Sequence, residues 1–518
     1  MSGDLVLDDV EVDGRPNRAV LVSGGLIRAV GEAGRLAPSP PDPPEPGARV
    51  APSPRRRVVD GGGAALLPGL HDHHVHLFAL AMRTASVWCG APAVDGPEAL
   101  AERLRVAAAA GPWADPGGWV RGVGWDDEVA GWPGRADLDA AVPDRPVRLQ
   151  HRSGDLWVLN GAALDRAGLD RPAPGAGRDR WPAGVELGPD DRPTGRIWGL
   201  DGWLRDRIGG GPPSLAAVST ALAAVGVTGV TDAGAHNGPA EVAALDASRR
   251  AGDLVQSATV MTSGPGEVLV TDPRGDTPDA PPLAHGPGPG PVGVALGPVK
   301  LVIAERVLPS PGELAGRIAA AHHAGRVVAV HAASRVAVVL ALAAFADAGA
   351  VPGDRLEHAA VVDPDALGEI ARLGLTVVTQ PHFVRENGDR YLAGVDPADR
   401  PWLYRGRGFL DAGVPLAAGS DAPVGGLDPW AAMAAAVDRR AASGAVIGTG
   451  EELSPEQAFA LFTGRPHDPG GPSRRIAPGE VADLCLIDRP WSAARRALGD
   501  VRVRATIAAG RVIFDAGG

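Results

Sequence analysis

The chain has 518 residues, a formal net charge of −12 at pH 7, and 45% hydrophobic and 22% charged residues. This composition is that of a soluble globular protein, and the acidic balance argues against a general nucleic-acid surface and against binding to anionic membranes. No stretch approaches the ~18 apolar residues of a membrane span, and the first residues lack the pattern of a signal peptide.

The two cysteines, Cys89 and Cys485, lie far apart in the sequence and cannot form a disulfide framework. Such sparse cysteine usage fits a reducing cytoplasm, where we expect the protein to act. Neither nucleic acid nor a membrane is expected as a partner, and homo-oligomerisation is left open.

Short β-strands are predicted at both ends of the chain. The N-terminal ones cover residues 5–7, 18–22 and 26–30, and the C-terminal ones lie within 482–487 and 501–514. Because matching β character flanks a long α/β middle, we expect one small β domain built from both termini. The proline-rich residues that follow the N-terminal strands, 35–57, are expected to form a loose surface excursion.

The most informative stretch is LLPGLHDHHVHL, residues 66–77, which holds four histidines and an aspartate within six positions. In an extended chain, residues two apart face the same side. His74 and His76 therefore project together and can share a divalent metal ion. The same spacing applies to His71 and His73, so spacing alone does not tell which of the two pairs binds the metal. An ordinary polar strand is the alternative, which only further ligands elsewhere can exclude.

The middle of the chain, from about residue 217 onward, alternates apolar strands that end in polar residues with Ala-rich helices. Successive strand ends are spaced near the ~30 residues of a βαβ unit, which favours an α/β barrel with its site at the carboxyl ends of the strands. A doubly wound sheet is the competitor, but no Gly-x-Gly-x-x-Gly convincingly follows a strand. The predicted strands are 227–232, 299–300, 327–331, 355–358, 375–380 and 414–421, with helices at 312–324, 335–347 and 364–373.

Two segments depart from this alternation. Residues 85–215 are rich in Trp, Pro, Gly and Arg and contain a predicted helix at 97–110. We interpret them as an insertion after the first strand of the barrel. Residues 273–298 are irregular in pattern and are expected to form a long loop near the fourth strand.

Further ligand candidates lie at the ends of later strands. His331 closes RVVAVHAAS, His358 closes RLEHA and Asp421 closes VPLAAGSDAPV. Lys300 lies within GPVKLVIAE, where burial is costly unless the amine is paired or modified. Each residue by itself has an ordinary structural explanation, but their joint occurrence at strand ends predicts a metal site. Glu357 precedes His358 in an extended segment, so we expect it to face away from that site.

The chain thus contains, in order, PGLHDHHVH, a strand Lys, a strand His, EHA and GSDAP. In this order it resembles the amidohydrolase superfamily, especially the family 3 branch, which includes formamide deformylases. The resemblance covers nearly the whole chain and includes GWDDEVAGWPGRADLDAAVPDRPVRLQ, LWVLNGAAL, DRPTGRI, GVTGVTDAG and IAPGEVADLCLID. It implies a (β/α)8 barrel at 66–475, with the insertion at about 85–215, beside a β-sandwich formed by 1–65 and 476–518.

The resemblance also implies the metal ligands. By the motif match, His74 and His76 rather than His71 and His73 take the first-strand positions. One or two zinc ions, or another divalent metal, are implied, and related enzymes carry a carbamate on the fourth-strand lysine. Carboxylation of this lysine is left open for the present chain. The full implied metal set is His74, His76, Lys300, His331, His358 and Asp421.

The activity implied is metal-dependent hydrolysis of the C–N bond of a small, partly apolar amide or formamide. Zinc lowers the pKa of bound water from about 15.7 to ~7. Asp421 is the expected catalytic residue, orienting the water and then delivering a proton to the leaving amine. The expected substrate contacts are His382 in TQPHFV, Trp125 and Asp126 in GWDDE, His151 at the end of PVRLQH, and Arg335 beyond His331.

Two departures from the family pattern bear on the substrate more than on the metal. Residues 153–155 read Ser-Gly-Asp where relatives have Asp-Gly-His, and the acidic residue expected after Thr194-Gly195 is missing. A deaminase of the same superfamily is one rival function, but alanines rather than an acid follow His331 and Lys300 is present. A non-catalytic barrel scaffold or binding protein is a rival of another class, which the complete ligand set disfavours.

Overall fold

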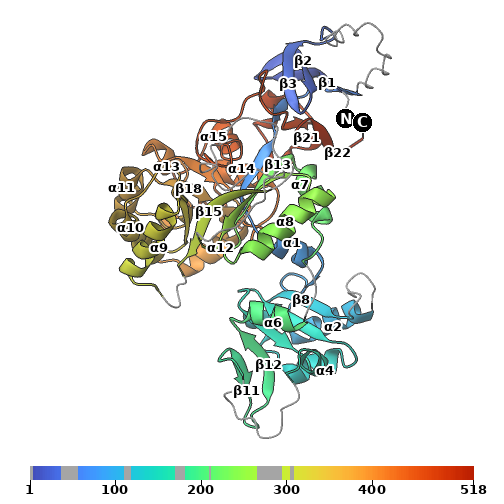
Figure 1. Cartoon of the computed structure of the whole chain (residues 1–518), viewed down its shortest axis with the longest axis vertical. Coiled ribbons are helices and arrows are strands. Elements are labelled where there is room, and N and C mark those ends of the chain that lie inside the picture. Colours follow the sequence, from blue (N-terminus) through green and yellow to red (C-terminus); the bar gives the residue numbers. More distant parts are fainter. Residues whose placement is uncertain are drawn as a thin grey trace. The chain divides into compact units, whose positions relative to one another are not determined.

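The computed structural model describes residues 4–36, 57–109, 118–169, 181–208, 212–264, 294–303 and 308–517 (Figure 1). The chain divides into two compact units, one formed by Met1–Leu77 with Leu215–Gly518 and the other by Phe78–Ser214. Most of the expected excursion at 35–57 and of the expected loop at 273–298 lies outside the described residues. The described end of that loop, 294–298, is already part of a strand.

The first unit contains the predicted barrel, which is confirmed as a sheet of eight parallel strands in the order β19-β18-β17-β16-β15-β14-β13-β6. All the ladders between neighbours in this order are parallel. β14 is the strand that the sequence did not predict. The bounds are β6 (Leu70–Val75), β13 (Val227–Asp232), β14 (Ser257–Thr262), β15 (Val294–Val302), β16 (Val328–Ala332), β17 (Arg355–His358), β18 (Thr376–Thr379) and β19 (Leu416–Ala418).

Helices follow these strands after short connections, because capping residues start them early. Ser334, three residues after His331, begins α10 by accepting a hydrogen bond from the amide of Ala337. Asp363 begins α11 in the same way with the amide of Ala366. Such N-caps satisfy helix amides that have no partner within the helix. The helices that follow barrel strands include α1 (Leu77–Thr84), α8 (Pro239–Ala251), α9 (Pro311–His323), α10 (Arg335–Ala348), α11 (Pro364–Leu373), α12 (Phe383–Gly394) and α14 (Pro429–Asp438).

The first and last barrel strands, β6 and β19, share no ladder among the described residues. Leu461 and Phe462 connect them, since Leu461 accepts from the amide of Ala418, the last residue of β19, and Phe462 accepts from the amide of His71, near the amino end of β6. Near their carboxyl ends the two segments meet directly.

Asp72 of β6 makes one of these direct connections. Its Oδ1 accepts the amide of Ser420 at 2.9 Å and the amide of His74 at 3.1 Å. The carboxylate is 2% exposed, and burial raises the pKa of Asp72 to about 6. A single buried side chain therefore fixes the segment after β19 against β6.

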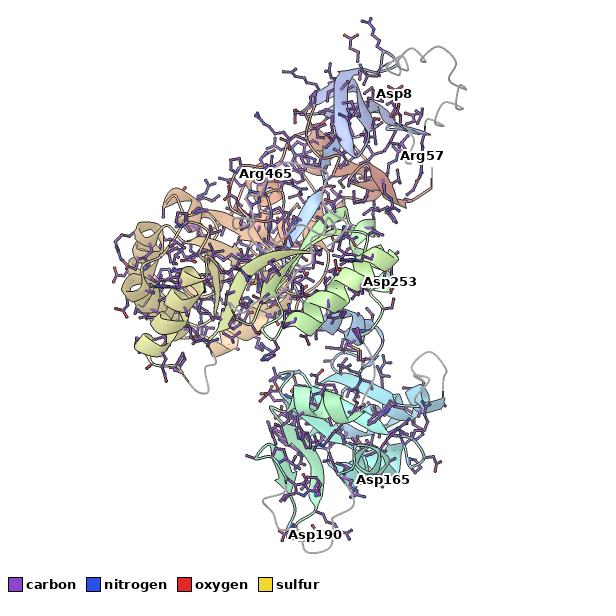
Figure 2. All side chains as sticks on the ribbon, in the orientation of Figure 1. Asp8, Arg57, Asp165, Asp190, Asp253 and Arg465 are labelled. Atoms are coloured by element: carbon purple, nitrogen blue, oxygen red, sulfur yellow. The ribbon has the colours of Figure 1, made fainter. Side chains whose placement is uncertain are left out.

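The termini of the chain form two four-stranded sheets that share one hydrophobic core, which includes Leu7, Val20, Leu66, Leu484 and Ile507. β5 pairs with β20, so sandwich pairing continues past residue 65, the boundary expected from the sequence. Arg57 also pairs with Asp515 at the surface, at 2.5 Å (Figure 2). The sheets are β3-β2-β1-β4, with β1 (Leu5–Val12), β2 (Arg15–Ser23), β3 (Leu26–Glu32) and β4 (Arg57–Asp60), and β22-β21-β20-β5, with β5 (Leu66–Pro68), β20 (Leu484–Ile487), β21 (Val503–Ala508) and β22 (Arg511–Asp515).

The second unit, Phe78–Ser214, overlaps the segment interpreted as an insertion. It has a six-stranded sheet in the order β11-β12-β10-β9-β8-β7 and its own hydrophobic core. None of the helices in the described part of the chain is both long and apolar enough to cross a membrane. Its elements after α1 are β7 (Val87–Trp88), α2 (Pro97–Ala109), β8 (Val120–Trp125), α3 (Asp127–Ala130), α4 (Arg135–Ala141), β9 (Val147–His151), β10 (Leu156–Leu159), α5 (Gly161–Arg166), β11 (Val185–Leu187), β12 (Pro193–Trp198) and α6 (Asp201–Ile208).

Removing the Asp72 carboxylate should loosen the join between β6 and β19. Asp72→Ala leaves two buried amides without an acceptor, at a loss of about 1–3 kcal/mol each. Asp72→Asn retains one side-chain oxygen and should lose less. Urea unfolding of the three proteins measures both values, and equal losses in the two variants would contradict this role of the side-chain oxygen.

Candidate metal centre

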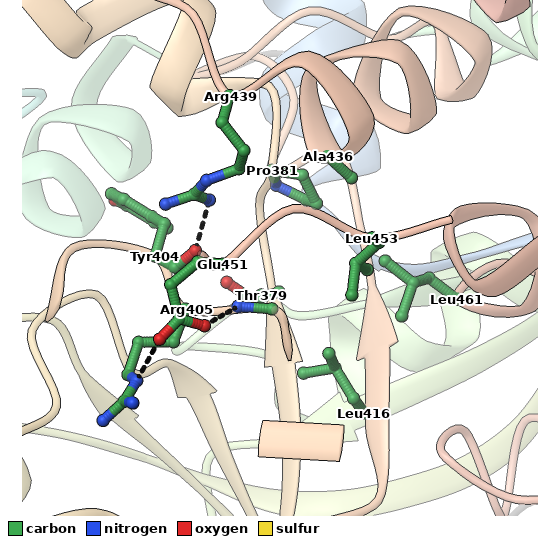
Figure 3. Close-up of a pocket in the computed structure, with 11 residues that line it drawn as sticks. Thr379, Pro381, Tyr404, Arg405, Leu416, Ala436, Arg439, Glu451, Leu453 and Leu461 are labelled. Atoms are coloured by element: carbon green, nitrogen blue, oxygen red, sulfur yellow. Dashed lines mark hydrogen bonds and ion pairs between the residues drawn. The ribbon is translucent and has the colours of Figure 1, made fainter. Parts of the chain in front are cut away.

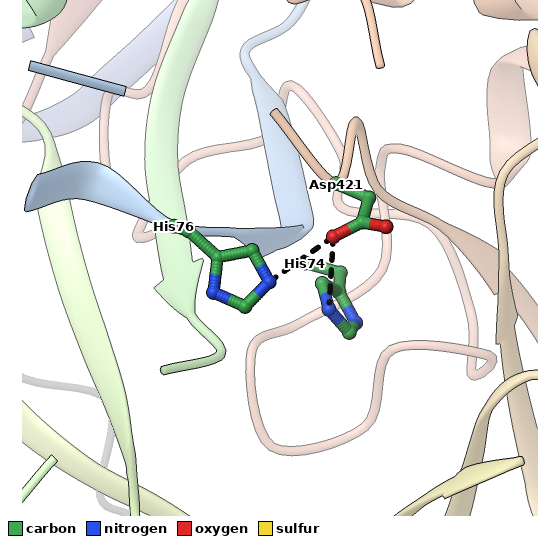
Figure 4. Close-up of side chains that lie close together, drawn as sticks. All are labelled: His74, His76 and Asp421. Atoms are coloured by element: carbon green, nitrogen blue, oxygen red, sulfur yellow. Dashed lines mark ion pairs between the residues drawn. The ribbon is translucent and has the colours of Figure 1, made fainter. Parts of the chain in front are cut away.

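Three of the predicted ligands, His74, His76 and Asp421, converge where β6 and β19 end (Figure 4). Asp421 Oδ1 lies 3.1 Å from His76 Nε2 and 3.5 Å from His74 Nε2. One ligand atom from each residue lies within 4.8 Å of the others. His74 and Asp421 are buried, while the side chain of His76 is 28% exposed, so the cluster can be reached from solvent.

The backbone brings these three residues together directly. The amide of Asp421 donates to the carbonyl of His74 at 2.7 Å, and the amide of His76 donates to the carbonyl of Ala422 at 2.9 Å. Asp421 has a φ of 50°, in the left-handed region that is strained for a residue with a side chain. The two hydrogen bonds hold it there, and its carboxylate consequently faces the histidines.

His331 and His358 lie beside this cluster. Their ring centroids are 4.4 Å apart, and the ring of His358 is 4.9 Å from that of His74. Burial lowers the pKa of His331 to about 2 and that of His74 to about 3, and it also lowers the pKa of His358. All three are thus neutral imidazoles, the form in which histidine binds a metal.

Asp421 is ionised, although burial acts to raise its pKa. The hydrogen bond from His76 and the neighbouring His74 and His358 outweigh burial and hold the pKa below its usual value. The cluster therefore combines neutral nitrogen donors with one anionic oxygen donor. Such a mixed nitrogen and oxygen set is typical of a divalent transition-metal site.

Lys300 of β15 is 3% exposed, and burial lowers the pKa of its amine. Its Nζ has no hydrogen-bond partner among the described residues, and the same holds for His74 Nε2 and His358 Nε2. Leaving a buried polar atom unpaired costs about 1–3 kcal/mol. Three such atoms in one cluster fit a site built for an ion that they would coordinate or help to hold.

Glu357 corrects one expectation, because it does not face away from the site. Its side chain is buried, Oε2 accepts a hydrogen bond from His74 Nδ1, and Oε1 lies 2.6 Å from Arg355 Nε. Side chains do not alternate between the two faces here, because β17 ends at His358, whose φ of 72° turns the chain. The signal that sequence reasoning missed was Arg355, since a buried arginine on the same strand needs a carboxylate.

Two predicted substrate contacts of the barrel have partners in the protein. His382 is buried, and its Nε2 donates to the carbonyl of Ser420 at 2.9 Å; burial lowers its pKa to about 4. Arg335 lies 2.8 Å from Asp363 and 3.2 Å from Asp399. Arg335 therefore already forms ion pairs with two carboxylates. His382 contacts the segment that carries Asp421.

The other predicted contacts belong to the second unit. Trp125 is fully buried, Asp126 is the N-cap of α3, and His151 Nε2 lies 3.0 Å from the carboxylate of Asp127. Each of them has a partner within its own unit. Substrate contact by these three residues stays a prediction.

A cavity of about 10 Å³ lies beside β18, with the ion pair of Arg405 and Glu451 in its wall (Figure 3). Its volume is enough for one water molecule. Thr379, Tyr404 and Arg439 also line it, but none of the six predicted metal residues does. The cavity therefore has no part in the candidate centre.

Comparisons with known proteins find relatives of this chain by sequence and by structure. The chain is 26% identical to N-substituted formamide deformylase of Arthrobacter pascens over 547 residues, which covers 96% of this chain and 95% of the relative. It is 27% identical to the putative amidohydrolase YtcJ of Bacillus subtilis over 165 residues, 31% of this chain and 28% of that protein.

A solved structure, an uncharacterised metal-dependent hydrolase from Pyrococcus horikoshii, supports the fold with a TM-score of 0.67 at 20% identity, covering 94% of this chain and 98% of that one. The model of the amidohydrolase family matches residues 57–514. The chain therefore belongs to the amidohydrolase family and is a hydrolase of carbon–nitrogen bonds other than peptide bonds.

Proposed function

We propose that this protein uses zinc to hydrolyse small N-substituted amides of the formamide type. The observation that carries the proposal is the convergence of His74, His76 and Asp421 beside buried, unpartnered nitrogens of His358 and Lys300. The similarity to a formamide deformylase over almost the full length of both chains supports this substrate class.

The residues proposed to hold one or two ions are those at the strand ends. Neutral histidines with a carboxylate are a donor set that suits zinc. A bound divalent ion supplies polarisation of the substrate carbonyl and a lowered pKa, about 7, for a coordinated water. The proposed set is His74, His76, Lys300, His331, His358 and Asp421.

Asp421 is the proposed catalytic residue. As an ionised carboxylate it can accept a proton from the attacking water and then deliver that proton to the leaving nitrogen. The C–N bond breaks as the nitrogen is protonated, because an unprotonated amine is a poor leaving group. The products are a carboxylic acid, which is formate for a formamide, and an amine.

Exposed apolar side chains at the strand ends support a substrate with an apolar substituent. Val302, two residues after Lys300, is 37% exposed, and Val424, three residues after Asp421, is 66% exposed. Binding sites for small molecules combine apolar walls with a few polar groups. We propose His382 as a polar contact, through Nδ1, which is buried and has no partner among the described residues.

The metal content of the purified protein should depend on the β6 histidines. We expect one or two zinc equivalents in the parent and a loss of zinc in His74→Ala/His76→Ala, measured by elemental analysis without added metal. His322→Ala is the control, since His322 pairs with Asp354 instead of the cluster. No metal in the parent would contradict the proposal and favour a non-catalytic barrel.

Replacement of Asp421 should abolish most of the turnover. Formate release from N-substituted formamides should show a kcat lower by about 100- to 10,000-fold in Asp421→Ala. Asp488→Asn, which alters an ion pair with Arg489, should leave kcat unchanged. Ammonia release from an aminated ring, with no turnover of amides, would replace the proposed reaction with a deamination.

A further inference from the structure

Arg355, Glu357 and His74 form a continuous chain of buried polar side chains. Arg355 Nε lies 2.6 Å from Glu357 Oε1, and Glu357 Oε2 meets His74 Nδ1. The side chain of Arg355 is 2% exposed, that of Glu357 is 0% and that of His74 is 1%. Solvent therefore does not compete for these contacts.

The chemistry of the three groups sets the direction of each hydrogen bond. A guanidinium only donates and an ionised carboxylate only accepts. His74 must therefore donate from Nδ1, and a neutral imidazole then has its lone pair on Nε2. That atom lies 3.5 Å from Asp421 Oδ1, within the cluster that includes His76.

We propose that Arg355 and Glu357 are positioning residues that fix His74 as the Nδ1–H tautomer and thereby present the lone pair of Nε2 to a divalent ion. The inference rests on the proposed metal site. Ligating histidines commonly donate their second ring N–H to a carboxylate, which orients the ring and makes it a stronger ligand. Neither residue is proposed as a substrate contact.

Arg355 is needed because a buried carboxylate without a cation is costly. Its Nη2 also lies 3.5 Å from the carbonyl of His73, so the guanidinium is held on two sides. By contrast, His358 Nδ1 meets a neutral group, the amide oxygen of Gln380, at 2.7 Å. The Nδ1 atom of His74 is thus held by a charge pair, whereas that of His358 is held by a neutral amide.

This arrangement makes Glu357→Gln an informative substitution. Its amide presents one oxygen and one NH2 group to two fixed neighbours. Because Arg355 can only donate, the oxygen should face Arg355 and the NH2 group should face His74. His74 would then accept at Nδ1 and carry its proton on Nε2, where the lone pair is needed.

Removing the arginine as well should reverse this effect. In Arg355→Met/Glu357→Gln the amide is free to rotate, so its oxygen can again accept from His74 Nδ1. Neither substituted residue carries a charge, so no buried ion is left without a partner. The double variant should therefore bind zinc more tightly than the single variant.

The control substitution is Glu451→Gln. Glu451 is also a buried glutamate that pairs with an arginine, Arg405, at 2.7 Å, and its other oxygen accepts the amides of Gly406 and Gly408. It contacts none of the proposed ligands in the described structure. Stability should fall in this variant, whereas zinc affinity should not.

The experiment titrates the metal-free proteins with Zn²⁺ against a chromophoric chelator and records His-selective ¹⁵N spectra. We expect Glu357→Gln to bind zinc about 10- to 100-fold more weakly than the parent, with partial recovery in the double variant and no change in Glu451→Gln. The His74 ring, identified by comparison with His74→Asn, should be Nδ1–H in the metal-free parent.

The outcomes separate the inference from the proposed function. A parent that binds no zinc overturns both. A parent that binds zinc while Glu357→Gln binds it equally well, or a His74 ring protonated on Nε2 in the metal-free parent, overturns the inference alone. The parent spectrum decides the matter even if a variant fails to fold.

Discussion

The join between β6 and β19 is the constraint on which the rest of the site depends. The other neighbouring barrel strands are held by ladders, whereas these two meet through the Asp72 carboxylate and the backbone of His74, His76 and Asp421. Three of the residues that close the barrel, His74, His76 and Asp421, therefore also carry proposed ligand atoms. Their mutual positions follow from the fold, and short capped connections such as the one from His331 to Ser334 keep the ligand-bearing strand ends rigid.

Much of the barrel was predictable because ligand-type residues end its apolar strands abruptly. His331 and Asp421 each follow a run of mostly small or branched apolar residues, whereas His358 follows the mixed sequence Arg-Leu-Glu, and the structure has a strand ending at or within three residues of each. The strand β14, with the sequence SATVMT, was missed because hydroxyl side chains interrupt its apolar pattern and no ligand marks its end. The apolar pattern thus identifies a strand best where a ligand-type residue marks its end.

Contacts between strands could not be predicted from a local sequence pattern. Alternation predicted an outward Glu357, but the strand ends one residue later in a left-handed turn, and the carboxylate meets His74 from β6. Side-chain spacing likewise left the pair His71 and His73 equal to the pair His74 and His76. The structure separates them, because Thr231 of the neighbouring strand lies 2.9 Å from His71 Nε2 while His74 Nε2 faces Asp421. Both distinctions depend on residues more than 150 positions away in sequence.

The unladdered join gives metal a second role, as a fastener. An ion that binds only the folded state stabilises that state, and here its proposed ligands lie on both sides of the join. In the metal-free chain the barrel would part along this line before any laddered pair of strands, since the least supported contacts open first.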